Sequence, residues 1–138
     1  MSKSSELAYL SAVKIKQIIE TKQISPIEVT QTYIDRIIEI DPKINSFCAK
    51  NYEQALRDAK RQEQQLMAGQ AQGLLFGLPI GIKDLEDTQD LNTTYGSMAY
   101  QHYVPKVDNE LVQRVRNAGA IILGKTNVPD MGAGANTR

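Results

Sequence analysis

The segment Ala120–Gly124 constrains the fold of this chain more than any other. It is a continuous apolar run, and it follows directly on a stretch with helical periodicity. Such a run is typical of a strand buried on both faces, because a strand with one wet face alternates apolar and polar residues. Helices must cover both faces of a sheet of this kind, so the segment predicts an α/β architecture.

A second apolar run, Leu78–Lys83, is also predicted to be a buried strand, and it ends in a lysine. Gly81 within it indicates a close backbone approach. We expect Lys83 to be poorly hydrated, an environment that disfavours the ammonium form of the side chain. A neutral amine can take a proton from a hydroxyl group, which is the Ser-Lys variant of nucleophilic catalysis. The alternative is a strand-end lysine whose charge reaches water beyond its apolar stem.

Helical spacing and capping signals predict several helices around these strands. They are expected from Ser11 to about Lys22, from the capping box Ser25–Glu28 to Asp41-Pro42, from a capping-box pattern at Asn51 to near Gly69, and from a cap at Asp108 to Gly119. A short strand is expected at Phe47–Ala49, and a polar loop follows Lys83.

Composition excludes several classes of partner. The chain has 138 residues, and its 16 basic and 16 acidic side chains leave a net charge of zero, so nothing indicates nucleic acid or an anionic membrane as a partner. Its apolar runs are far below the ~20 residues of a membrane span, and its start lacks the apolar core of a signal peptide. We therefore expect a single domain with a cytoplasmic location.

Cysteine and histidine are too few for a structural zinc site or an intrachain disulfide, because Cys48 and His102 are the only ones present. Cys48 lies in a short apolar run and is expected in the core, where free cysteines usually act as small hydrophobes. His102 is expected in a loop. No metal and no cofactor are predicted.

The segment Gly119–Thr126 matches the written P-loop pattern. A working P-loop needs a strand before its first glycine and a helix after its last residue, so that backbone amides and the helix N-terminus hold the phosphates. Here a predicted helix comes before the pattern and Pro129 comes soon after it. A nucleotide-binding protein is therefore only a minor alternative.

Several ordered motifs together resemble the amidase signature family. They are the lysine motif Gly77–Asp84, the turn Thr93–Ser97, the segment Val104–Asp108, the run Gly119–Asn127 and the N-terminal helix start Ile24–Val29. The resemblance covers nearly the whole chain, and such a series is far more specific than any single motif.

The resemblance implies an amidase that hydrolyses a small-molecule carboxylic amide through an acyl-enzyme. Lys83 would be the catalytic lysine, acting with a serine linked through a cis peptide and with a nucleophilic serine. Asp84 is expected to bond loop amides, because a carboxylate close to Lys83 would favour the charged amine. Met131 and Gly132 would run beside the substrate pocket, and a mere connecting loop is the alternative for them.

The two serines of the family lie in a Gly/Ser-rich region that is absent from this sequence. Residues 1–138 are therefore expected to form the N-terminal part of one domain: the N-terminal helices and first strands of a large mixed sheet covered by helices. Such a chain is expected to be inactive alone, and to form homo-oligomers or associate through an unpaired sheet edge. A non-catalytic remnant or interaction module is the second interpretation. The substrate, and the choice between a free amidase and an amidotransferase subunit, stay open.

Overall fold

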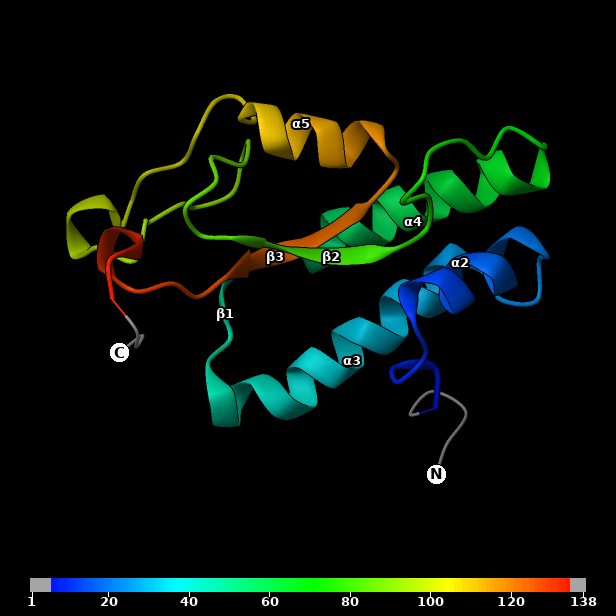
Figure 1. Cartoon of the computed structure of the whole chain (residues 1–138), viewed down its shortest axis with the longest axis horizontal. Helices are drawn as coiled ribbons and strands as arrows, with labels where there is room; N and C mark the ends of the chain where they lie inside the picture. Colours follow the sequence, from blue (N-terminus) through cyan, green and yellow to red (C-terminus); the bar gives the residue numbers. More distant parts are fainter. Residues whose placement is uncertain (1–5, 135–138) are drawn as a thin grey trace.

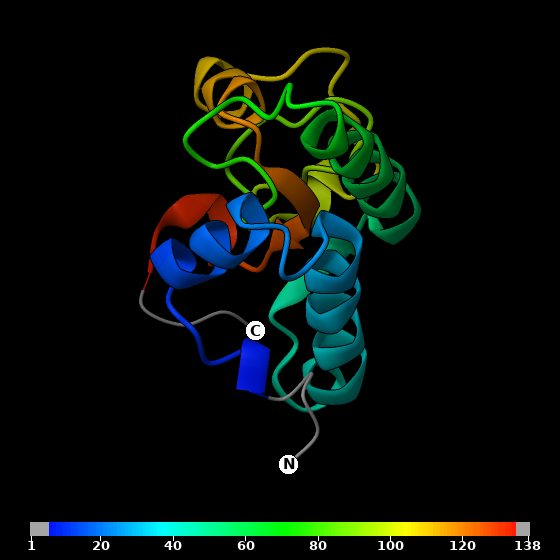
Figure 2. The same ribbon diagram turned by 90° about the vertical axis from the view of Figure 1, so that its right-hand side faces the viewer.

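The computed structural model describes residues 6–134, in which a small sheet lies between helices (Figures 1 and 2). The helices are α2 (Ala12–Glu20), α3 (Pro26–Ile44), α4 (Tyr52–Met67) and α5 (Glu110–Asn117); the strands are β1 (Phe47–Lys50), β2 (Pro79–Lys83) and β3 (Ile121–Thr126); two 3₁₀ turns are η1 (Met98–Tyr100) and η2 (Asp130–Gly132). The predicted α/β class is confirmed. No helix in the described range has the length and apolar character needed to span a membrane.

The sheet is mixed, with strand order β1-β3-β2. The central strand β3 runs antiparallel to β1 and parallel to β2. The parallel pair is connected by the long loop after β2 and by α5, which crosses over one face of the sheet (Figure 1). β1 and β2 are the edges of this three-stranded sheet.

The central strand is covered on both faces, as its apolar run predicts. Ile121 and Leu123 pack in a cluster with residues of α3 and α4, such as Ile34 and Ala59. Ile122 lies in a different cluster with Val112 of α5. Helices on both sides of β3 therefore fix the position of its carboxyl end.

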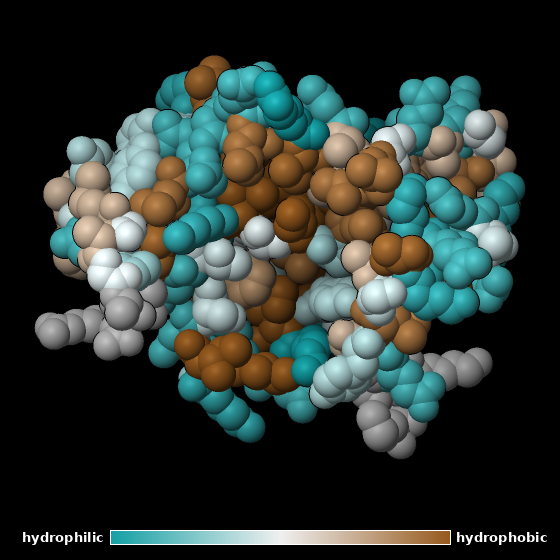
Figure 3. Space-filling view, in the orientation of Figure 1, coloured by the Kyte–Doolittle hydropathy of each residue, from teal (hydrophilic) through white to brown (hydrophobic). Residues whose placement is uncertain are grey.

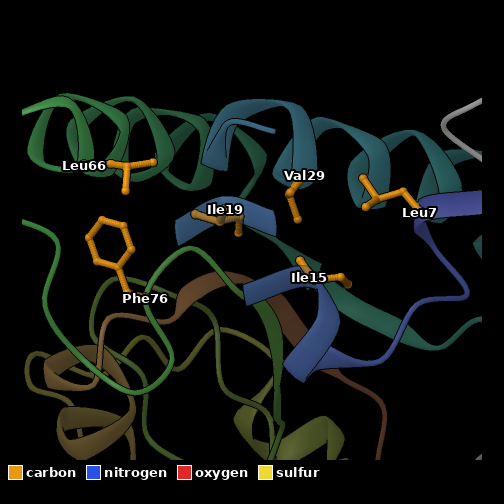
Figure 4. Packing of buried hydrophobic residues seen from close by; sticks show 6 residues of the cluster. All are labelled: Leu7, Ile15, Ile19, Val29, Leu66 and Phe76. Atoms are coloured by element: carbon orange, nitrogen blue, oxygen red, sulfur yellow. The ribbon is translucent and has the colours of Figure 1, made fainter. Parts of the chain in front are cut away.

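A third apolar cluster joins the N-terminal helices to the turn before β2 (Figure 4). Its buried members are Leu7, Ile15, Ile19, Val29, Leu66 and Phe76. Ile19 also lies against Gly77, where a Cβ atom would approach the Ile19 Cδ1 atom to 2.8 Å. This cluster thus anchors the start of β2.

Two predicted helix boundaries are wrong. Helix α3 continues through Pro42 to Ile44, because proline in a last turn removes only one bond of a ladder that is about to end. The amide of Asn45, in the left-handed region with φ 50°, then bonds the Asp41 carbonyl oxygen and closes the helix. Helix α5 is capped by Asn109, whose side chain accepts from the amide of Val112.

Two other local predictions also fail. Asn51 precedes α4 as expected, but its side chain does not cap the helix and its Nδ2 instead donates to the Ile122 carbonyl oxygen at 3.4 Å. Cys48 is exposed because β1 is an edge strand, although a core position was expected. His102 lies in an exposed turn, as predicted.

Candidate functional site

Lys83 lies exposed at the carboxyl end of β2, so the predicted burial is wrong. It pairs with Thr126 of β3, and paired residues of a sheet point to the same face. Gly81 shares this face, where a Cβ atom would lie 2.7 Å from the Thr126 Cγ2 atom and 3.3 Å from the Phe47 ring. The close approach at Gly81 is therefore to side chains. β2 is an edge strand, which leaves the end of this face open.

An apolar groove of about 360 Å³ runs along the same face of the sheet, between α3 and β2. Its lining includes Ile37, Phe47, Pro79 and Gly81. In the orientation of Figure 1, hydrophobic residues also gather over the middle of the molecule, where β2 crosses it (Figure 3). Lys83 thus ends a strand whose surroundings are largely apolar.

Among residues 6–134, the fully buried lysine is Lys125 of β3, which is 0 % exposed. Regular alternation from Leu123 would turn Lys125 toward α3 and α4. The register of β3 against β2 shifts between Ile80 and Gly81, so that Lys125 pairs with Ile82 and faces the other side of the sheet. This bulge also requires Gly124, because a Cβ atom there would lie 2.2 Å from the Ala49 carbonyl oxygen.

The ammonium group of Lys125 is held by the loop after β2. Its Nζ atom donates to the Thr93 Oγ1 atom at 2.7 Å and to the Glu86 carbonyl oxygen at 2.5 Å. The Asp84 Oδ1 atom lies 3.5 Å away. Burial lowers the pKa of Lys125, and the charge of Asp84 opposes that shift. The cluster is therefore an interior ion pair with polar neighbours.

Asp84, at 1 % exposure, points into the interior. Its carboxylate accepts from the Thr94 amide at 3.1 Å and from the Thr94 Oγ1 atom at 2.5 Å. Its own amide donates to the Thr126 carbonyl oxygen at 3.0 Å and extends the ladder of β2 and β3 by one bond. The expectation that Asp84 bonds loop amides is thereby confirmed.

Tyr95 connects the end of β2 to the turn that contains Met131 and Gly132. Its amide donates to the Asp84 carbonyl oxygen at 3.0 Å, and its carbonyl oxygen accepts from the Met131 amide at 2.7 Å. Gly132 lies against Leu85, where a Cβ atom would approach the Leu85 Cδ1 atom to 2.7 Å. Both residues thus lie close to the strand end that carries Lys83. Contact of either with a substrate stays a prediction.

An aromatic cluster covers this loop. Tyr95 stacks on Tyr103 with ring centroids 6.0 Å apart and meets Tyr100 edge-on at 5.1 Å. The Tyr95 hydroxyl donates to Asp87, and the combination of burial and this carboxylate raises the pKa of Tyr95. Sequence reasoning missed this cluster and the partners of Lys125. Lys125 lay in the P-loop pattern, which indicated the wrong chemistry, and in the family run Gly119–Asn127, which did not indicate its partners.

The P-loop pattern forms no phosphate cradle. Helix α5 precedes it, the pattern ends within β3, and the Lys125 amine is held by Thr93 and the Glu86 carbonyl oxygen. A nucleotide-binding function has no geometric support. Within residues 6–134, no group of three or more His, Cys, Asp or Glu side chains is arranged to hold a metal ion.

A polar cleft of about 620 Å³ lies away from Lys83, between α4, α5 and the loop at residues 89–91. Its buried carboxylates have partners in the cleft: Asp58 pairs with Arg61 at 2.9 Å, and Asp108 pairs with Arg116 at 2.6 Å. Each of these two carboxylates is neutralised by an arginine of the same cleft, so neither is an unpaired group that would indicate a ligand.

Comparisons with known proteins show which sequences this chain resembles. The chain is 39% identical over 123 residues to one of the subunits of the glutamyl-tRNA(Gln) amidotransferase of Acaryochloris marina, a match that covers 89% of this chain and 26% of that protein. The chain thus spans about a quarter of the length of that curated relative.

Solved structures show the same likeness. A bacterial aryl acylamidase of the amidase signature family superposes with a TM-score of 0.88 at 31% identity, over 94% of this chain and 27% of that one. The peptide amidase of Stenotrophomonas maltophilia gives a TM-score of 0.83 at 30% identity, over 89% of this chain and 26% of that one. Residues 28–138 match the family described as Amidase, and the chain therefore belongs to the amidase signature family.

Proposed function

We propose that these residues form the lysine-bearing part of an amidase that cleaves a small-molecule carboxylic amide. Lys83 is the proton acceptor, and it acts with two serines of the family that lie outside this sequence. The nucleophilic serine attacks the amide carbonyl, ammonia or an amine leaves with the transferred proton, and water releases the acyl group.

The placement of Lys83 is the observation that carries this proposal. Its side chain ends β2 on the open face of the sheet, and it has no hydrogen bond or ion pair with any residue in the range 6–134. The neighbouring carboxylate of Asp84 points to the opposite face, where Thr94 and Lys125 hold it. A lysine so placed is available to a reacting group, whereas an amine bound to a carboxylate would be held in its charged form.

The test uses the protein expressed from its complete open reading frame. Ammonia release from a panel of primary amides is measured for the wild type, for Lys83→Ala and for the matched control Lys106→Ala, which removes an exposed lysine of the loop. We expect Lys83→Ala to lower kcat/KM by about 10²–10⁴-fold, the range for a lost general base, and Lys106→Ala to leave it unchanged. Wild-type turnover in Lys83→Ala would refute the role of Lys83. A protein inactive on every amide would favour the non-catalytic remnant or interaction module.

A second candidate function is an ammonia-supplying amidotransferase subunit. The observation that favours it is the similarity to the amidotransferase subunits of Acaryochloris marina and Trichodesmium erythraeum, which are 39% and 38% identical to this chain. Glutamine as the amide donor distinguishes the two candidates. Turnover of glutamine that depends on added partner subunits would support the amidotransferase, and turnover of simple amides by the protein alone would support the free amidase.

We also propose that residues 1–138 are inactive by themselves and associate through the open edge of β2. The edge strand exposes unpaired backbone groups, and hydrophobic residues surround it (Figure 3). Amide hydrolysis by purified residues 1–138, abolished by Lys83→Ala, would contradict the inactivity. A monomer at all concentrations in analytical ultracentrifugation would contradict the association.

A further inference from the structure

The two lysines at the end of the sheet point to opposite faces, and Asp84 lies between them along the chain. Lys83 pairs with Thr126 on the open face. Lys125 pairs with Ile82, on the face covered by α5 and the loop. Asp84 follows Lys83 directly, and its carboxylate lies on the Lys125 side, with the Asp84 Oδ1 and Lys125 Nζ atoms 3.5 Å apart.

This placement matters because Asp84 is the carboxylate nearest to Lys83 in the chain. A negative charge beside an amine favours the ammonium form, which cannot accept a proton. The Thr94 amide and hydroxyl both donate to the Asp84 carboxylate. A buried charge of this kind is weakly screened by water, so a nearby cation is needed to cancel it.

Lys125 is the one cation placed to do so within residues 6–134. The other titratable groups near it are Asp87 of the loop, which accepts from the Tyr95 hydroxyl, and Cys48 of β1, whose Sγ atom lies 3.5 Å from the Lys125 carbonyl oxygen. Glu86 meets the cluster only through its carbonyl oxygen, since its carboxylate accepts from Asn109.

Within the described part of the chain, the groove on the open face of the sheet offers no counter-ion for Asp84. The charged groups along its groove are Arg36 and Asp41 of α3. Arg36 donates to the Tyr9 hydroxyl, and Asp41 is paired with Lys50 at 2.9 Å. These groups already have partners, and they lie on the side of the sheet opposite to the Asp84 carboxylate.

We propose that Lys125 is a positioning residue that neutralises Asp84 and thereby removes the influence of this carboxylate on the proton affinity of the Lys83 amine. The inference rests on the proposed function of Lys83. The bulge at Gly124 is the device that turns Lys125 to the Asp84 side of the sheet. The pair also stabilises the loop.

The test measures the acid limb of the kcat/KM–pH profile in the protein expressed from its complete open reading frame. Lys125→Met leaves a net negative charge, so the limb is expected to move to higher pH by about half a unit to one unit. Asp84→Asn leaves a net positive charge, and the limb is expected to move to lower pH by a similar amount. The double variant restores neutrality, and its limb is expected to coincide with that of the wild type.

Thr93→Val is the control for a purely structural role, because it removes one acceptor of Lys125 without changing any charge. Its limb is expected to stay in place. The proposal is overturned if the acid limb moves in the same direction in both single variants, or if it moves in neither. It is also overturned if Thr93→Val moves the limb as far as Lys125→Met does. The limb is expected to move in a different direction in each single variant, so one folded single variant is sufficient to test the proposal. If neither folds, displacement of the limb by half a unit in the double variant overturns the proposal, and coincidence supports it.

Failure of the inference can be told apart from failure of the proposed function. If Lys83→Ala is inactive and the limbs do not move, Lys83 is the base and the role of Lys125 is wrong. If Lys83→Ala keeps its activity, the proposed function fails. In that case, trace acetylation of Lys83 at several pH values, quantified by mass spectrometry, measures the fraction of neutral amine directly. The inference about Lys125 then still requires that the pH at which Lys83 becomes reactive moves in opposite directions in the two single variants.

Discussion

The N-terminal helices and the loop after β2 both bury side chains, but the buried side chains are apolar in the helices and largely polar in the loop. The helices α2 and α3 meet the turn before β2 through apolar residues such as Ile19, Val29 and Phe76. In the loop and the strand end that it covers, the buried side chains include Asp84, Thr93 and Lys125. One region is held by removal of apolar surface from water, and the other by directional bonds between buried polar groups.

The difference predicts how each region responds to the loss of one side chain. Apolar packing loses a contribution that scales with the volume removed, and neighbours can relax into part of the space. A polar network loses more, because the partner left behind keeps its charge or its unmet hydrogen bond in a place without water.

Lys125→Ala is expected to have the largest effect. It leaves the Asp84 carboxylate buried without a counter-charge, a loss that typically costs about 3–5 kcal/mol. Urea unfolding at pH 7 measures the change in the free energy of unfolding. Lys106→Ala, which removes an exposed lysine from the same half of the chain, is the control and is expected to change it by less than about 0.5 kcal/mol. Equal values for the two variants would show that the ion pair contributes nothing.

Ile19→Ala is expected to follow, with a loss of about 3 kcal/mol, because Ile19 is fully buried among apolar residues. The same unfolding experiment measures it. Val13→Ala on the same helix removes a side chain that is 81% exposed, and it is expected to be close to neutral. If Ile19→Ala costs more than Lys125→Ala, the contrast between the two regions is reversed.

The same contrast decides what could be predicted from the sequence. Capping signals and apolar spacing are local, so the start of α3 at Ser25, the strand β2 and the buried strand β3 were predicted. Asp84 as a loop-bonding carboxylate was predicted as well. The burial of Lys83 was wrong because it depends on what covers an edge strand, which no local pattern contains.

The burial of Lys125 could not be predicted for a related reason. Its side chain faces the loop only because β3 has a bulge at Gly124, and a one-residue shift reverses every following side chain. Its partner Thr93 is 32 residues away in the sequence. Contacts of that kind depend on tertiary structure, and hydrophobic periodicity does not report them.

Asp41 provides a polar contact within the helical region. Protonation of its carboxylate is expected to lower the free energy of unfolding by less than Lys125→Ala or Ile19→Ala does. Burial opposes its ionisation, but bonds from Lys50, Ser46 and the Phe47 amide prevail and hold the pKa of Asp41 at about 2. The folded-state pKa thus lies below the usual value, so this stabilisation is present above about pH 4 and is lost as pH falls toward 2. Acid titration of the unfolding free energy should show a loss of about 1–2 kcal/mol over this window. Asp41→Asn should remove that part of the acid dependence, and an unchanged slope would contradict the assignment.

Ser25→Ala is expected to have the smallest effect of the four, about 1 kcal/mol. Ser25 and Glu28 form a reciprocal capping box, in which the Glu28 amide bonds the Ser25 Oγ atom at 3.1 Å and the Ser25 amide bonds the Glu28 Oε2 atom at 2.9 Å. Both bonds are exposed, so water replaces much of what the substitution removes. Glu39→Ala, an exposed change farther along α3, is the control in the same unfolding experiment. A loss at Ser25 as large as that of Lys125→Ala would mean that exposure does not separate the two polar contacts, and burial of charge would then not explain the stability of the loop.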